Sequence, residues 1–179
     1  MAVLKDLITN EEFTTTAEIA ERLSAAGIDY ERWNAAHDIS ENASDEEILA
    51  AYSAEIDRLK TDGGYVTADV INIVPTTPDL DALLDRFNKE HWHDEDEVRF
   101  IIKGTGIFVI APENGNVVSI VMRPGDLIRV PRGTKHWFGL AGDRTVRAIR
   151  LFEDMSGWTP HYTGSGLDEQ FPLNAAPAA

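Results

Sequence analysis

Residues 98–111, VRFIIKGTGIFVIA, place two β-branched and apolar runs on either side of a Gly-Thr-Gly turn. The same pattern of short β-branched and apolar runs, separated by Gly and Pro turn signals, continues to residue 152. These runs cover residues 98–103, 107–111, 117–122, 127–130 and 146–152. The Asn-Gly pair at 114–115 is a strong hairpin signal. Regular short strands with such turns predict a β-sandwich or barrel.

The part of the chain before this region reads as mostly helical. Residues 17–26 predict one helix, which the following glycine ends. Ser44 and Glu47 have the spacing of a capping box and predict a second helix to about residue 60, with apolar residues at helical spacing. Residues 65–74 alternate and predict a strand, and residues 79–87 predict a further short helix.

The length of 179 residues fits one domain, residues 1–179. We expect a mainly β fold with N-terminal helices: a helical or mixed part over about 1–88 and a β-barrel core over about 65–155. The tail, residues 170–179, has little to bury and is expected to be disordered. The helices could either support the barrel or cover its mouth.

Charge and composition exclude several classes of partner. The chain has 16 Lys and Arg against 31 Asp and Glu, a net charge of −15. An acidic surface repels phosphate backbones and anionic lipids, so nucleic acids and membranes are poor partners. There is no cysteine, which excludes disulfides and thiolate metal sites. Without a signal peptide pattern or an apolar stretch of roughly 18 residues, a cytoplasmic location is expected.

The segment HWHDEDE, residues 91–97, contains the first candidate ligands. In an extended chain, positions two apart share a face, so His91 and His93 can present their imidazoles to one point. Glu97 has the same parity. A lone His-x-His is common without a metal, and this pattern needs a second segment.

That second segment is Pro124-Gly125, then PRG at 131–133, then His136. Its tight turns can return a strand beside its neighbours and bring His136 to the first cluster. Imidazole nitrogens with a carboxylate oxygen suit iron, nickel, manganese or zinc. Three His and one Glu fill four of six octahedral positions, whereas a structural zinc site closes at four ligands. The pattern therefore predicts an ion that does chemistry. His37 and His161 are not preceded by such Pro and Gly turn residues, and they are interpreted as ordinary residues.

These two segments resemble the paired motifs of the cupin superfamily, which implies a cupin-type double-stranded β-helix, or jelly-roll barrel. Asp85 and Leu140 depart from that pattern at positions of fold geometry. The longer string HWHDEDEVRF at 91–100, with HWF at 136–138, AIRLF at 148–152 and GW at 157–158, resembles the acireductone dioxygenases of methionine salvage. This string is far more specific than the general cupin pattern.

The resemblance implies one Fe²⁺ or Ni²⁺ per chain, held by His91, His93, Glu97 and His136. It implies acireductone, an enediol, and O2 as the small-molecule partners, and a monomer. With iron, the family's products are 4-methylthio-2-oxobutanoate and formate. With nickel, they are methylthiopropionate, formate and carbon monoxide. Which ion is bound in the cell is not readable from the sequence.

The resemblance also implies roles for residues around the ligands. Asp96 would help to generate the substrate dianion, Glu90 would act in metal incorporation, and Arg99 would meet substrate charge or transmit a local change. Phe138 and Trp158 would wall the pocket near the substrate's thioether end.

Each of these residues also has an alternative interpretation. The two acids could be solvated, and the aromatics could be core. Arg99 shares strand parity with Glu97, and an inward Arg needs an anionic partner, either the dianion or Glu95. Two other functions stay open: a different cupin dioxygenase or isomerase, and a non-catalytic metal-binding cupin.

Overall fold

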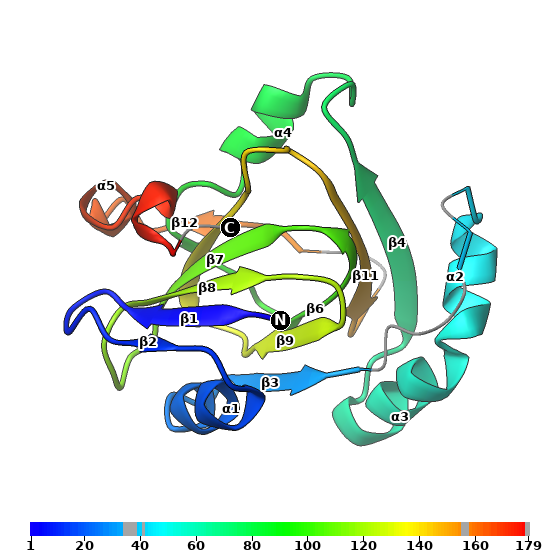
Figure 1. Cartoon of the computed structure of the whole chain (residues 1–179), viewed down its shortest axis with the longest axis horizontal. Helices are drawn as coiled ribbons and strands as arrows, with labels where there is room; N and C mark the ends of the chain where they lie inside the picture. The colour runs from blue at the N-terminus through cyan, green and yellow to red at the C-terminus, as the bar shows by residue number, and fades with distance from the viewer. Residues whose placement is uncertain (34–38, 41, 155–157, 178–179) are drawn as a thin grey trace.

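The structure is a computed structural model that describes residues 1–33, 39–40, 42–154 and 158–177. Two antiparallel sheets face each other and form a barrel (Figure 1), the predicted cupin-type double-stranded β-helix. The strand order is β12-β5-β10-β7-β8-β1-β2 in the seven-stranded sheet and β3-β9-β6-β11-β4 in the five-stranded sheet.

The seven-stranded sheet contains β1 (Val3–Asp6), β2 (Glu12–Phe13), β5 (His91–Trp92), β7 (Gly106–Ala111), β8 (Val118–Met122), β10 (Lys135–Leu140) and β12 (His161–Tyr162). The five-stranded sheet contains β3 (Asp29–Arg32), β4 (Thr67–Ile73), β6 (Glu97–Gly104), β9 (Asp126–Val130) and β11 (Val146–Phe152). The helices are α1 (Thr16–Ser24), α2 (Asp45–Ala51), α3 (Ser53–Gly63), α4 (Leu80–Asp85) and α5 (Leu167–Gln170), followed by the 3-10 turn η1 (Leu173–Ala175). In the described part of the chain, no helix is both long and apolar enough to span a membrane.

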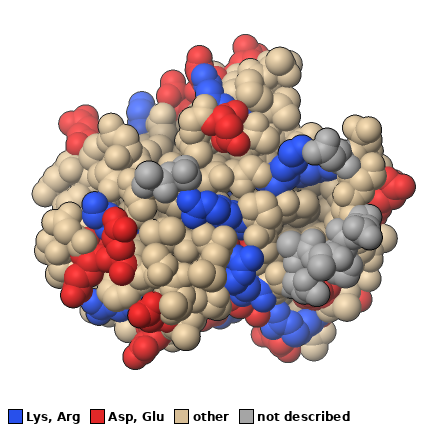
Figure 2. All heavy atoms as spheres, in the orientation of Figure 1, with Lys and Arg blue, Asp and Glu red and all other residues tan. Residues whose placement is uncertain are grey.

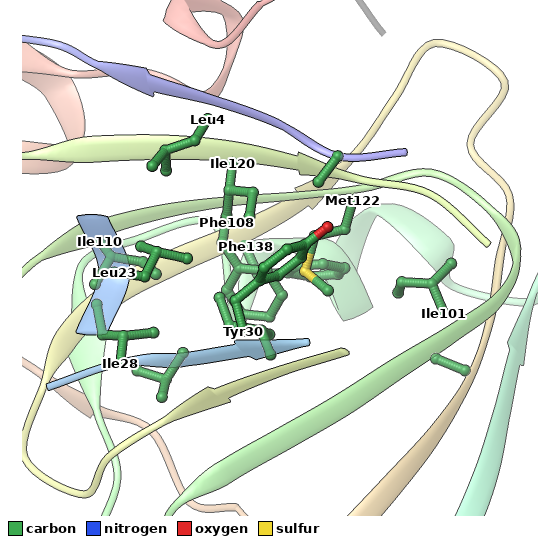
Figure 3. Packing of buried hydrophobic residues seen from close by; sticks show 14 of the residues in the cluster. Leu4, Leu23, Ile28, Tyr30, Ile101, Phe108, Ile110, Ile120, Met122 and Phe138 are labelled. Carbon is green, nitrogen blue, oxygen red and sulfur yellow. The ribbon is translucent and has the colours of Figure 1, made fainter. Parts of the chain in front are cut away.

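The main core fills the space between the two sheets (Figure 3). It is made of large apolar side chains from both sheets, among them Tyr30, Ile101, Phe108, Ile110, Ile120, Met122 and Ile128. Burial of each such side chain contributes about 1.5–3 kcal/mol. The glycine that ends β6 is needed here: Gly104 has φ +76°, and a Cβ at that position would collide with the carbonyl of Thr145.

A second core lies on the outer face of the five-stranded sheet. Alternate residues of β6 and β11 point outward there and pack against α2 and α3; the set includes Ile48, Tyr52, Ile56, Val98, Phe100, Ile149 and Leu151. These two helices therefore support the barrel from outside. The same alternation turns Glu97 and Arg99 to the inside of the barrel.

The structure corrects three details of the sequence analysis. The N-terminal part contains strands as well as helices: Leu4 of β1 is paired with Ile120 of β8, and Tyr30 of β3 with Ile128 of β9. The single helix predicted from Ser44 to about residue 60 is divided at Tyr52, where φ is −105° and ψ is 18°.

The tail, which the sequence predicted to be disordered from residue 170, instead packs against the barrel. The indole of Trp137 donates a hydrogen bond to the carbonyl of Phe171, and Leu173 packs beside Ile107 and Val121. The tail is therefore held against the outer face of the seven-stranded sheet as far as the described residues extend.

Candidate metal centre

Four side chains predicted to be metal ligands converge inside the barrel. His91 lies on β5, His93 follows that strand directly, Glu97 begins β6 and His136 lies on β10. One potential ligand atom of each residue lies within 4.8 Å of those of the others. The four residues are at most 2% exposed, so the cluster is shielded from solvent.

Strand pairing explains how these distant residues meet. His136 is directly opposite His91 in the antiparallel pair of β10 and β5. Nε2 of His136 lies 3.0 Å from Oε2 of Glu97, and Nε2 of His93 lies 3.2 Å from the same oxygen. The ring centroid of His91 lies 4.8 Å from that of His93 and 4.6 Å from that of His136.

The orientation of each imidazole is set by a backbone carbonyl oxygen near its Nδ1 atom. These oxygens belong to Lys89 for His91 at 2.6 Å, Thr159 for His93 at 2.9 Å and Thr134 for His136 at 2.8 Å. With the proton on Nδ1 donated to the carbonyl, each neutral ring presents the lone pair of Nε2 to the cluster.

The cluster fits a divalent transition-metal ion. Nε2 of His91 is buried and has no hydrogen-bond partner among the described residues. A buried polar atom without a partner is destabilising, and a bound cation would satisfy it. The donor set of imidazole nitrogens and one carboxylate is that of iron, nickel, manganese or zinc sites.

Arg99 is the inward cation that the strand parity predicted. Its guanidinium lies 2.9 Å from Oε1 of Glu97, so the partner is Glu97 and not Glu95. Cζ of Arg99 also lies 4.1 Å from the ring centroid of Phe138 and 5.5 Å from that of Trp158. The aromatic rings exclude water from the ion pair and stabilise the cation.

Burial and neighbouring charges shift the pKa values of the cluster in different directions. Burial lowers the pKa of His91 to about 4, and the charge of nearby His136 adds to this effect. Burial also disfavours protonation of His93, but Glu97 outweighs it and raises the pKa of His93. Burial alone would raise the pKa of Glu97, yet Arg99 and the imidazoles hold it well below its usual range. An ionised Glu97 and a neutral His91 are the forms that bind a cation.

Asp96 lies between β5 and β6, and both of its carboxylate oxygens accept hydrogen bonds. The Tyr65 hydroxyl donates to Oδ2 at 3.0 Å, and the backbone N–H of Arg132 donates to Oδ1 at 3.0 Å. Arg132 belongs to the turn before β10, which carries His136. Asp96 therefore connects the two segments that supply the ligands, and its role in removing a substrate proton stays a prediction.

A cavity of about 390 Å³ opens beside one of the four candidate ligands, His93. It is lined by His93, Trp158 and Thr159 together with the charged residues Asp94, Glu95, Arg132, Glu153 and Asp154. The ring of Trp158 is stacked at 6.1 Å from that of His93. Of the two predicted pocket aromatics, Trp158 thus borders the approach to a ligand, while Phe138 packs on Arg99.

Glu90 is not a solvated acid, because it is only 2% exposed. Its Oε2 accepts a hydrogen bond from the Thr163 hydroxyl at 2.8 Å and another from the Ser165 hydroxyl. A role in metal incorporation stays a prediction for this residue.

His161, interpreted from the sequence as an ordinary residue, lies outside the ligand cluster. It lies on β12, its Nε2 is 2.6 Å from Oδ2 of Asp94, and its ring stacks at 4.4 Å on that of Trp92. No local pattern marks this position, because its neighbours are 67 and more positions away in the chain. His37 lies outside the described residues.

Comparisons with known proteins agree with this geometry. The family model described as the ARD/ARD' family matches residues 5–160. An acireductone dioxygenase of Synechococcus sp. is 43% identical over 157 residues, which cover 88% of this chain and 86% of the relative. That of Aquifex aeolicus is 44% identical over 162 residues, covering 90% and 88%.

A solved structure is also similar over nearly its whole length. It is the acireductone dioxygenase from Bacillus anthracis with a cadmium ion in its active centre, and it superposes with a TM-score of 0.84 at 40% identity. The match covers 90% of this chain and 98% of that chain.

Proposed function

The chain belongs to the ARD/ARD' family of acireductone dioxygenases, and we propose that it cleaves acireductone with O2 at a single metal ion held by His91, His93, Glu97 and His136. The substrate is the enediol 1,2-dihydroxy-3-keto-5-methylthiopentene. The observation that carries the proposal is the convergence of these four buried ligands within 4.8 Å of one another. The cadmium ion in the Bacillus anthracis relative supports it.

The residues around the cluster have separate roles in the proposed reaction. When bound, the ion supplies Lewis acidity and a template that favour loss of protons from an enediol. Arg99 keeps Glu97 ionised and oriented. Trp158 borders the cavity and contacts the apolar thioether end of the substrate, while Phe138 backs Arg99. Asp96 accepts a proton as the dianion forms, a step that general base catalysis accelerates.

We assign one Fe²⁺ or Ni²⁺ to each chain. Both ions accept the same imidazole and carboxylate ligands, so their availability decides which one is bound. The iron form gives 4-methylthio-2-oxobutanoate and formate. The nickel form gives methylthiopropionate, formate and carbon monoxide.

We also propose that the protein is a monomer and that it is located in the cytoplasm. Acidic side chains gather at the periphery of the face shown in Figure 2, and several Lys and Arg side chains lie nearer its middle. The overall charge of −15 opposes binding to phosphate backbones. The partners are therefore the small substrate and O2.

The test combines elemental analysis of the purified protein with assays of its iron-loaded and nickel-loaded forms. We expect one ion per chain, O2 uptake with acireductone in both forms, and carbon monoxide from the nickel form alone. An iron-loaded protein that takes up no O2 with acireductone would contradict the proposal. Tight binding of acireductone without turnover would instead indicate a metal-dependent binding protein.

A further inference from the structure

The chain returns to the metal centre through a short segment, residues 159–165, which we name the C-terminal strap. It contains β12, which pairs with β5 so that His161 is opposite Trp92 and Tyr162 is opposite His91. The strap therefore runs alongside the strand that leads into the first two ligands. It is more than a cover for the sheet edge, because one of its carbonyls reaches a ligand.

The three ligand histidines differ in where their Nδ1 acceptor comes from. For His91 and His136, the carbonyl belongs to the residue two positions earlier on the same segment. For His93 it belongs to Thr159 of the strap, 66 positions away. The orientation of His93 thus depends on the strap, whereas the other two imidazoles are oriented locally.

Glu90 holds the strap at its other end. Its carbonyl oxygen accepts a hydrogen bond from the Thr163 backbone N–H at 3.2 Å. Its carboxylate Oε2 accepts hydrogen bonds from the hydroxyls of Thr163 and Ser165. Three hydrogen bonds thus attach the strap to Glu90.

We propose that Glu90 is a positioning residue that acts on the metal centre through the strap. By holding Thr163 and Ser165 it keeps the Thr159 carbonyl in place, and that carbonyl keeps Nε2 of His93 turned to the other ligands. The inference rests on the proposed function, since it requires that the cluster binds an ion. The rival explanation is that the charge of Glu90 attracts the ion directly, and this would not depend on the two hydroxyls.

Three variants separate the two routes: Glu90→Leu, which removes the acceptor, the double variant Thr163→Val/Ser165→Ala, and their combination. Ni²⁺ affinity is measured by competition with a chelator. Because loss of an outer partner of a ligand typically costs about 10- to 100-fold in metal affinity, we expect that loss in both Glu90→Leu and the double variant. The combination should be no weaker than Glu90→Leu, because all three changes break one connection. Thr163→Ser keeps the hydroxyl and is the matched control, with unchanged affinity.

A second readout identifies the ligand that responds. Nitrogen NMR of the imidazoles in the metal-free protein reports which ring nitrogen carries the proton. In Glu90→Leu and the double variant, His93 should lose its fixed Nδ1–H form, while His91 and His136 keep theirs. A general loss of structure would affect all three rings alike.

Wild-type Ni²⁺ affinity in the double variant, together with weakened binding in Glu90→Leu, would overturn the inference in favour of the charge. Unchanged His93 spectra in both variants would also overturn it. If the double variant does not fold, Thr163→Val against Thr163→Ser gives the same comparison. Failure of the proposed function is distinguishable, because then the unmodified protein itself would not bind Ni²⁺.

Discussion

The guanidinium of Arg99 lies 2.9 Å from Oε1 of Glu97, while Oε2 of the same carboxylate lies 3.0 Å from Nε2 of His136. One carboxylate thus has a cation on one side and the imidazole cluster on the other. Glu97 is 2% exposed and Arg99 is 5% exposed, so neither charge has water as a substitute partner. Breaking such a buried pair leaves an uncompensated charge.

The first prediction concerns this pair. Arg99→Met should destabilise the metal-free protein by about 3–5 kcal/mol, because Glu97 stays buried without its cation. The loss should be smaller with Ni²⁺ bound, since the ion is a second positive partner. Urea unfolding of both forms measures the difference. As a control, Arg144→Met breaks the largely exposed pair with Asp81 and should cost less than about 1 kcal/mol. Equal destabilisation with and without Ni²⁺ would contradict the argument.

The second prediction concerns the ligands. His91→Ala, His93→Ala and His136→Ala should each lower metal content and abolish turnover, because a ligand is lost outright. The loss of affinity should exceed the roughly 10- to 100-fold that removal of an outer partner costs. Metal titration and O2 uptake measure the two effects. His37→Ala, outside both ligand segments, should behave like the unmodified protein. Full metal content in any of the three ligand variants would remove that residue from the site.

The third prediction separates proton transfer from positioning at Asp96. Asp96→Asn should keep the metal but slow turnover by about 100-fold or more, the range that general base catalysis supplies. Tyr65→Phe removes one donor to Asp96 and leaves the carboxylate, so it should retain most turnover. Metal content and kcat are measured for both variants. Full activity of Asp96→Asn would exclude the proposed role.

The fourth prediction is a pH dependence of the metal-free protein. The pKa of His91 is about 4 in the folded state, below its ordinary value of 6.5. Between these values the unfolded chain binds a proton at His91 that the folded protein does not. Stability should therefore fall as pH is lowered from 6.5 towards 4, by at most about 3 kcal/mol from this residue.

Two other ligands modify this pH profile. The depressed pKa of Glu97 acts in the same direction, with stability lost as the pH falls below its ordinary range. The raised pKa of His93 acts in the opposite direction, with stability lost as pH rises through that pKa. Urea unfolding at several pH values measures the slope, and His91→Gln should make it shallower. An unchanged slope in His91→Gln would contradict the assignment to His91.

Local sequence patterns predicted the barrel strands, and the four candidate ligands that they marked cluster in the structure. Strand parity around Glu97 placed Arg99 inward, and the turn residues before His136 predicted the return of that strand. These features depend on neighbours within a few positions, so a sequence displays them directly. Strand parity alone does not distinguish the two possible partners of Arg99, because Glu95 and Glu97 both share its parity.

Features that depend on distant pairing were not predictable in this way. The strands at residues 3–6 and 29–32 are short. The first pairs locally with β2 over two residues, but their partners within the barrel, β8 and β9, follow only after residue 117. The hydrogen bond from Thr163 to Glu90 joins residues 73 positions apart, and no local sequence pattern at either residue predicts it. Tertiary contacts decide these features, and a single sequence contains no local trace of them.

The late arrival of those partners has a consequence for biosynthesis. Leu4 and Tyr30 leave the ribosome well before their barrel partners, Ile120 of β8 and Ile128 of β9, are translated. Until then the emerging polypeptide presents unpaired strand edges and apolar side chains to the cell, a state that attracts chaperones and favours aggregation. Closure of the barrel must also wait for contacts between remote parts of the chain, which makes the folding step slow compared with that of a helical protein of this size.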